Sequence, residues 1–198
     1  MTRLRTYRDA GQAFPIYITV VAGLLFLALA YLAVGQAAAN RNSAQTAADA
    51  AALAAAQNTR DQLADQWKLD VLDPTKWQDI FDGIVNADPS CWRAYQLAAQ
   101  NDATVEDCAP TGPLGYSVRV KTSKAVGDSV VPGTENVHST ATARAVIEPL
   151  CKFELPGADA GDDALPQLTC KDGNWDLNPD DLTDLPGPED LFDVHLAD

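Results

Sequence analysis

The chain has 198 residues, of which 28 are acidic and 14 are basic, so its formal net charge is −14. The sequence isoelectric point lies near 4.3. Such an acidic chain excludes nucleic acid as an expected ligand, because binding to a phosphate backbone depends on lysine and arginine.

The first predicted element is a single membrane-spanning helix. No formally charged side chain lies between Asp9 and Arg41, and the centre of this stretch, from Phe14 to Val34, is apolar. That length reaches the roughly 20 residues that a helix needs to cross about 30 Å of hydrocarbon. The expected partner of this segment is therefore membrane lipid.

The flanking charges predict the orientation of this helix. Arg3, Arg5 and Arg8 precede it with only Asp9 to offset them, and an excess of arginine and lysine keeps that side in the cytoplasm. We therefore expect a single-pass protein of the cell membrane with a cytoplasmic N-terminus and an extracellular C-terminal part. The alternative is a secretory signal cleaved after the alanines at 37–39, but the apolar core of such a signal is only about 7 to 15 residues long.

Beyond the membrane, the helix is expected to continue as a stalk. The alanine-rich sequence from Gln36 to about Trp67 contains neither glycine nor proline, and alanine has the highest helix propensity. Small side chains on one face let another backbone approach closely. The predicted packing stripe consists of Ala44, Ala47, Ala48, Ala51 and Ala55. Two interpretations stay open: the stripe packs against the chain's own head or a neighbouring subunit, or the alanines only favour the helix.

The following segments predict a small head that begins with helices. An amphipathic helix is expected over 74–85 and a second, shorter helix over 90–100. The aromatic side chains of Trp77, Trp92 and Tyr95 on these helices are expected to pack in the core.

A sheet and an acidic tail are expected after these helices. Residues 116–123 and 139–147 alternate between apolar and polar side chains, which is typical of half-buried strands. The connection through 127–133 favours an antiparallel pair with a long loop. From Asp159 onward, Asp, Pro and Gly dominate the sequence, and we expect this stretch to be largely irregular.

The four cysteines, Cys91, Cys108, Cys151 and Cys170, are expected to form disulfides. An even number of cysteines in an exported region is typical of an oxidising compartment. Proximity along the chain favours Cys91 with Cys108 and Cys151 with Cys170, although four cysteines allow three connectivities. Each such short loop is worth about 3 kcal/mol in the chain-entropy model.

No motif predicts a catalytic, cofactor-binding or metal site. The sequence has no C-x-x-C pair, and its two histidines, His138 and His195, stand apart, so zinc is not expected. The Asp- and Asn-rich run 172–180 partly resembles a calcium-binding loop, but Leu177 and Thr183 occupy the positions that need glycine and a bidentate glutamate. We therefore expect no enzyme, no cofactor and no small-molecule substrate.

These elements predict an α+β fold: a long transmembrane helix, an alanine-rich stalk, a disulfide-stapled head of helices and antiparallel sheet, and an irregular acidic tail. The predicted parts are a basic cytoplasmic head at 1–12, the transmembrane helix at 13–39, the extracytoplasmic stalk at 40–68, the small α+β domain at 69–156 and the tail, rich in Pro and Gly, at 157–198.

Two motifs flank the membrane helix. Gly11 precedes it, and a run of the pattern Q-x-A-A-D-A-A-A-L-A-A-A follows it from Gln45 to Ala56. Together they resemble the TadE/TadG-like proteins of Flp (Tad) pilus assembly, of the actinobacterial type. The resemblance covers less than a third of the chain.

The resemblance implies a membrane-anchored pilus-assembly protein or minor pilin-like subunit. Its partners would be other pilus or secretion-system subunits, including further copies of itself. Processing of the prepilin type between Gly11 and Gln12 is also implied. The chain departs from pilin relatives at Ile16, where they carry Glu, and the missing carboxylate argues against ordinary filament packing. The alternative is an exported, membrane-anchored binding module unrelated to pilus assembly.

Overall fold

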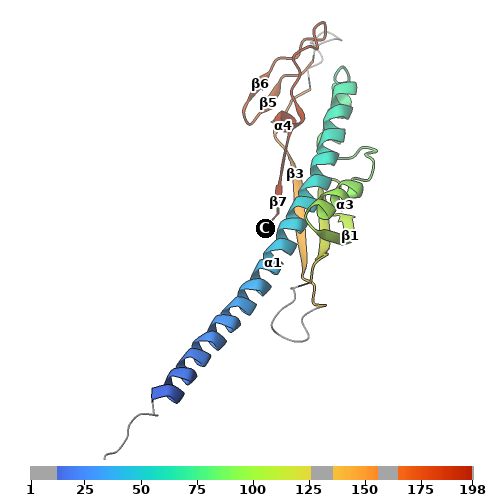
Figure 1. Cartoon of the computed structure of the whole chain (residues 1–198). Coiled ribbons are helices and arrows are strands. Elements are labelled where there is room, and N and C mark those ends of the chain that lie inside the picture. The colour runs from blue at the N-terminus through green and yellow to red at the C-terminus, as the bar shows by residue number, and fades with distance from the viewer. Residues whose placement is uncertain (1–12, 126–135, 156–164, 198) are drawn as a thin grey trace, which may run out of the picture.

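The longest element of the computed structural model is the helix α1, Ala13–Leu69, which has 57 residues. The structure describes residues 13–125, 136–155 and 165–197. At 1.5 Å per residue, α1 is about 85 Å long. Its N-terminal half stands clear of the other elements, and its C-terminal half lies along a sheet (Figure 1). The expected continuation of the apolar helix into the alanine-rich segment is thus confirmed.

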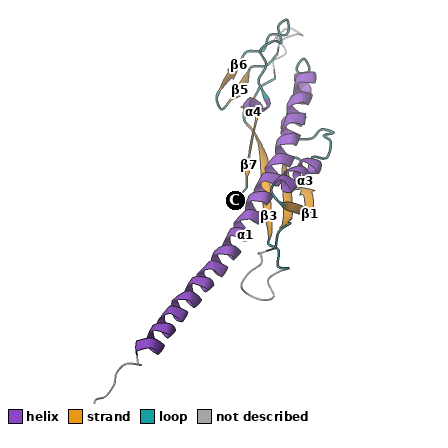
Figure 2. Cartoon of the chain, viewed as in Figure 1, coloured by secondary structure: helices purple, strands orange, loops and turns teal. Residues whose placement is uncertain are grey.

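The remaining elements form the head beside the C-terminal half of α1 (Figure 2). In chain order they are η1 Pro74–Lys76, α2 Trp77–Phe81, α3 Cys91–Gln100, β1 Ala103–Pro110, β2 Gly115–Thr122, β3 Thr140–Pro149, β4 Cys151–Lys152, β5 Leu168–Cys170, β6 Gly173–Trp175, α4 Pro188–Leu191 and β7 Phe192–Leu196. A four-stranded sheet has the order β1-β2-β3-β7, and a small three-stranded sheet has the order β4-β5-β6. All described strand pairs in both sheets are antiparallel.

The predicted strand pair is the centre of the larger sheet. β2 and β3 pair in the register Gly115↔Val146 to Lys121↔Thr140. The predicted alternation is confirmed on β2, where Tyr116, Val118, Val120 and Thr122 are buried and face α1, which contacts both strands. The predicted connection at 127–133 lies outside the described residues. β1 was not expected, because a register shift after Val105 interrupts its alternation.

The alanine-rich part of α1 is the middle of the core. α1 contacts β2 and β3 on one side and α3 on another. Fully buried alanines supply most of this surface on α1: Ala44, Ala47, Ala48, Ala51, Ala52, Ala55 and Ala56. Ala94 and Ala98 of α3 are also fully buried. Alanine pairs at this interface let the helix axes lie close together, since side-chain size sets interhelical distance.

A second part of the core is aromatic and lies near the C-terminal end of α1. The ring centroids of Trp67 and Trp77 are 5.4 Å apart, and those of Trp77 and Phe153 are 5.2 Å apart. Phe81 links this pair to Phe192, with centroids 5.4 Å apart. Such tilted and edge-on pairs add to the stabilisation from burial. The predicted burial of Trp77 is confirmed.

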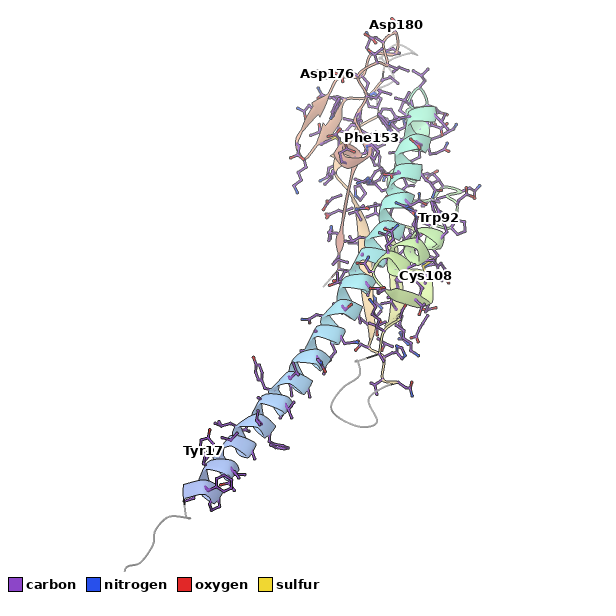
Figure 3. All side chains as sticks on the ribbon, in the orientation of Figure 1. Tyr17, Trp92, Cys108, Phe153, Asp176 and Asp180 are labelled. Carbon is purple, nitrogen blue, oxygen red and sulfur yellow. A yellow bond between two sulfur atoms is a disulfide. The ribbon has the colours of Figure 1, made fainter. Side chains whose placement is uncertain are left out.

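The predicted burial of Trp92 and Tyr95 is wrong. Their side chains are 55% and 53% exposed, and Figure 3 shows Trp92 on the outer side of the head. The reason is that α3 turns its small side chains, Ala94 and Ala98, towards α1. The helix face with the largest apolar side chains is therefore not the face that packs.

The expectation of a largely irregular tail is not confirmed. The described part of that segment, 165–197, contains β5, β6, α4 and β7. Leu168, Leu191 and Phe192 are fully buried, and β7 extends the main sheet through pairs such as Pro149↔Phe192. A few apolar residues in an acidic sequence are therefore enough to anchor the C-terminal segment to the core.

Each of the two disulfides joins cysteines that follow one another in the order of cysteines along the chain, which is the pairing that proximity favoured. Cys91–Cys108 connects α3 to β1, and Cys151–Cys170 connects β4 to β5. The first closes a loop of sequence separation 17 and the second one of 19. The second bond also ties the C-terminal segment to β4, which directly follows β3 along the chain.

Candidate functional site: the exposed half of α1 and its junction with the head

The N-terminal half of α1 exposes large apolar side chains. Tyr31 is 83% exposed, Phe14 72% and Phe26 71%. Within residues 13–125, 136–155 and 165–197, α1 is the one helix that is long and apolar enough to cross a membrane. A surface of this kind is stable only in lipid or against other proteins.

The polar group of Thr19 in this segment is satisfied by the helix itself. Its hydroxyl lies 2.9 Å from the carbonyl oxygen of Pro15 and 2.8 Å from that of Ile16, and it donates within the helix. A hydroxyl bonded to its own backbone needs no water, which makes it compatible with hydrocarbon.

The head begins at Asn40, just beyond the apolar segment. Asn40 Nδ2 donates to the carbonyl oxygens of Ala125 at 3.1 Å and Lys124 at 3.4 Å. Asn40 Oδ1 accepts from the hydroxyl of Thr122 at 3.2 Å, and Thr122 Oγ1 accepts from the backbone N–H of Ser139 at 3.1 Å. Asn40 is therefore bonded to the end of β2 and the residues after it, and Thr122 connects it to Ser139, the residue before β3.

Further along α1, a buried polar network fixes the helix to α3 and β2. Thr59 Oγ1 lies 2.7 Å from Ser90 Oγ and 3.0 Å from the hydroxyl oxygen of Tyr116. Gln62 Oε1 accepts from the backbone N–H of Asp88 at 2.7 Å. Thr59 and Ser90 are nearly or fully buried, so their mutual hydrogen bond avoids the cost of unpaired polar groups.

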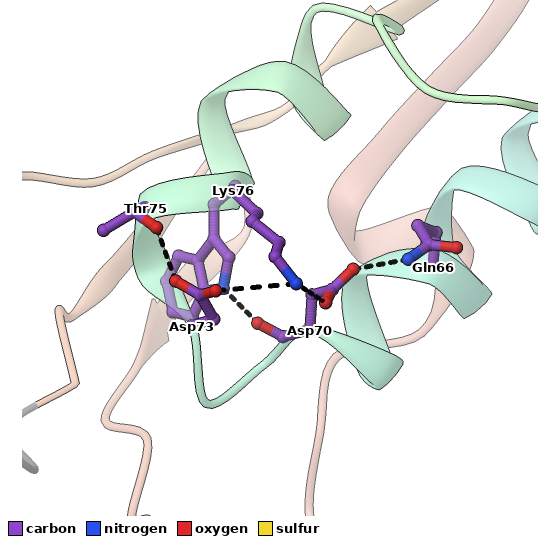
Figure 4. Close-up of polar contacts among 6 residues, drawn as sticks. Gln66, Asp70, Asp73, Thr75 and Lys76 are labelled. Carbon is purple, nitrogen blue, oxygen red and sulfur yellow. Dashed lines mark hydrogen bonds and ion pairs between the residues drawn. The ribbon is translucent and has the colours of Figure 1, made fainter.

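An ion-paired turn ends α1 (Figure 4). Lys76 Nζ donates to Asp70 Oδ1 at 2.6 Å, and Gln66 donates to the other carboxylate oxygen of Asp70. These two contacts hold the pKa of Asp70 below its usual range, and the bond to Asp70 raises the pKa of Lys76. Trp77 Nε1 donates to the backbone carbonyl of Asp70 at 3.0 Å, which connects the turn to the aromatic core.

At the other end of the head, the acidic run that partly resembles a calcium loop lines a cavity. The cavity has a volume of about 490 Å³, and its lining includes Asp176, Asn178 and Asp181. Figure 3 shows Asp176 and Asp180 far from Tyr17 on the apolar half of α1. Asp181 accepts hydrogen bonds from Thr183, and these lower the pKa of Asp181.

A family model matches the part of the chain that contains the apolar run and the alanine-rich motif. Residues 11–58 match the Tad family of Flp pilus-assembly TadE/G-like proteins. The predicted resemblance is thereby confirmed. No significant match is found among curated proteins or among solved structures.

The TadE/G-like segment, residues 11–58, contains two different parts of α1. It covers about a quarter of the chain and contains both the exposed apolar half of α1 and the buried alanines up to Ala56. It ends next to Thr59, which bonds to Ser90 and Tyr116. The segment thus joins a membrane-compatible helix to a head-packing surface, and its match indicates a role related to pilus assembly.

The predicted site residues fall into three groups. Gly11 and Gln12 lie outside the described residues. The cysteines form the two disulfides. The stripe of Ala44, Ala47, Ala48, Ala51 and Ala55 is buried within the chain's own head. Of the partners expected for the stripe, the chain's own head is the one that covers these alanines in the single chain.

Some features of the structure were not predicted from the sequence. Asn40 had a weak signal, because it is the first polar residue of the group Asn40–Ser43 after the apolar run. The Thr59–Ser90 pair had none, since its members are 31 residues apart. Another group of side chains, Glu148, Asp193 and His195, meets on β3 and β7.

Proposed function

We propose that this protein is a membrane-anchored, minor pilin-like structural subunit of a Flp-type pilus-assembly system. The observation that carries the proposal is the exposed apolar half of α1 inside the TadE/G-like segment. The role is structural, not catalytic: α1 anchors the chain and contacts the helices of other subunits, and the head presents its own surface to them.

The backbone of the exposed half offers space for such contacts. A Cβ atom added at Gly23 or Gly35 would meet no atom of the chain within 4 Å. Small residues in a membrane helix let a second helix approach closely, and van der Waals packing then holds the pair together. Since the alanine stripe is used by the head, the exposed half is the part of α1 that remains for contacts between subunits.

The residue at position 16 favours an anchored assembly role over ordinary filament packing. Ile16 is 64% exposed on the apolar half of α1 and carries no charge. Pilin relatives hold a Glu at the corresponding place, where it neutralises the terminal amine of a neighbouring subunit. An uncharged side chain is stable in hydrocarbon without any partner.

The experiment compares the full-length chain with a Gly23→Leu variant in cells that lack the native copy. Because the added side chain meets nothing in its own chain, the head should fold normally. We expect fewer pili and weaker co-purification with pilus components, since the larger side chain separates packed helices. Leu25→Ile, which keeps the side-chain volume, is the matched control and should behave as wild type.

Two results would contradict the proposal. One is normal piliation in cells without this chain. The other is recovery of Gly23→Leu protein with the same pilus components, in the same amounts, as wild type and the Leu25→Ile control. Circular dichroism of the purified variants checks that both keep the secondary structure of the head.

A further inference from the structure

The outward face of the β3–β7 pair gathers three potential metal ligands. Glu148 of β3 lies directly opposite Asp193 of β7, and Val146 lies opposite His195. Residues two apart on a strand share a face, so Glu148, Asp193 and His195 point to the same side. The opposite side is the core side, where Ile147 and Phe192 are buried.

The three side chains are close enough to bind one ion. One ligand atom from each lies within 4.8 Å of the others. His195 Nδ1 and Asp193 Oδ2 are 3.1 Å apart. Two ligand atoms in a tetrahedral zinc site, each about 2.0–2.1 Å from the metal, are about 3.3 Å apart. The hydrogen bond between His195 and Asp193 holds their ligand atoms close to this separation, and a ligand atom of Glu148 lies within 4.8 Å of both.

The local charges also favour a cation. Two carboxylates directly opposite each other on neighbouring strands repel and destabilise the pair. Within the described parts of the chain, no lysine or arginine forms an ion pair with Glu148 or Asp193, and His195 is the one basic group that contacts Asp193. A bound divalent cation would replace this repulsion with attraction to both carboxylates.

We propose that Glu148, Asp193 and His195 bind Zn²⁺. One imidazole with two carboxylates suits zinc, whereas calcium and magnesium prefer a larger number of oxygen ligands. The three side chains leave one coordination position for water or for a side chain from another molecule. Asp193 and His195 lie on the edge strand β7 and Glu148 on β3, so the ion links β7 to the central part of the sheet.

The three side chains form no motif in the sequence. His195 stands apart from other histidines and cysteines in the sequence, and Glu148 lies 45 positions before Asp193. The pairing of β7 with β3 brings them together. The one local signal is the spacing of Asp193 and His195, which places two ligands on the same face of a strand.

The test is a calorimetric titration of Zn²⁺ into the full-length, metal-stripped chain in detergent micelles. We expect one saturable site per chain and a higher unfolding temperature with Zn²⁺, because a ligand that binds only the folded state stabilises it. His195→Gln and Glu148→Gln should each weaken binding at least about tenfold, since even outer contacts of a metal site contribute that much. All three side chains are exposed, so both variants should fold.

Matched controls separate this site from other weak sites on an acidic chain. His138→Gln removes the other histidine, and Asp181→Asn alters the acidic cavity; both should keep wild-type affinity for Zn²⁺. The absence of saturable binding would overturn the proposal. Equal affinity of wild type and His195→Gln would do the same, as would loss of binding in His138→Gln. None of these results depends on the role in pilus assembly, which is measured through Gly23.

Discussion

Asn40 marks the residue at which the environment of α1 changes. Up to Gly35 the large side chains of the helix are mostly exposed and apolar, and from Ala44 onward alanines are buried against the head. Asn40 lies between and bonds to Thr122, Lys124 and Ala125. A polar side chain here satisfies the backbone groups at the ends of the strands, which an apolar residue would leave unpaired.

Replacing Asn40 with alanine should therefore destabilise the head while leaving the exposed half of α1 unchanged. We expect a loss of about 1–3 kcal/mol in the free energy of unfolding, the usual cost of unpaired, partly buried polar groups. Urea unfolding in micelles, followed by the fluorescence of the buried Trp67 and Trp77, measures it. Asn42→Ala, at an exposed position two residues on, is the control and should change little.

The ion-paired turn at Asp70 should make a small, pH-dependent contribution to stability. Its pKa is lowered by Lys76 and Gln66, so the contribution is complete above the ordinary pKa of aspartate and is lost as the pH falls through the lower value in the folded state. The raised pKa of Lys76 means that its contribution is lost only at strongly alkaline pH.

The measurement is the difference in urea midpoint between wild type and Asp70→Asn at several pH values. The variant should be slightly less stable near neutral pH, and the difference should disappear well below about pH 4, where the carboxylate is protonated. A difference that stays constant down to pH 2 would show that the ion pair does not cause it. Because Lys76 is 55% exposed, the effect should also decrease in high salt.

At the scale of elements, α1 is one helix with two different surfaces. The first half presents large apolar side chains outward, and the second half presents alanines to β2, β3 and α3. The alanine-rich motif of the TadE/G-like segment therefore serves the fold of the head. Within this motif, Gln45 Nε2 donates a hydrogen bond to Asp49 Oδ1 at 2.7 Å, one helical turn further along α1.

Ala51→Leu should disrupt this packing. Ala51 is fully buried, and three extra carbon atoms in a close-packed interface typically cost about 1–3 kcal/mol. The same substitution at the exposed Ala38 adds apolar surface without a clash and should leave the unfolding midpoint of the head unchanged. If Ala51→Leu unfolds like wild type but loses its pilus partners, the stripe serves contacts between subunits instead.

At the scale of the whole molecule, the chain is polarised along α1. The apolar half of the helix lies at one end, and the acidic loops with Asp176 and Asp180 lie at the other (Figure 3). Because the head begins at Asn40 and the apolar run extends to Val34, the head lies close to the membrane surface when the apolar half spans the bilayer. The alanine-rich half of α1 is part of the head and not a free stalk.

This arrangement predicts the result of a protease-protection experiment on intact cells without a cell wall. An N-terminal tag should be protected and a C-terminal tag should be digested, because the excess of arginine before the helix favours a cytoplasmic N-terminus. The intact mass of the extracted chain then reports processing: loss of residues 1–11 indicates cleavage between Gly11 and Gln12. Digestion of both tags, or a mass that starts after Ala39, would contradict the anchored topology.

The sequence by itself determined the features that depend on local composition. The apolar run, the alanine-rich helix, the alternation of β2 and β3 and the proximity of paired cysteines are all readable over short distances, and the TadE/G-like motif lies within one helix. These features follow from helix propensity, strand period and loop length, which do not require knowledge of distant residues.

Only the tertiary structure decided which surfaces meet. In the fold, the alanine stripe is buried in the chain's own head, whereas Trp92 and Tyr95 are exposed. Phe192, from an acidic segment, is part of the core. Glu148 lies close to Asp193 and His195. Burial depends on which partner each face finds, so the larger aromatic face of α3 remained outside while small residues allowed the closer contact. Contacts between residues far apart in the sequence depend on which surfaces pack best in the core, and local sequence patterns do not contain this information.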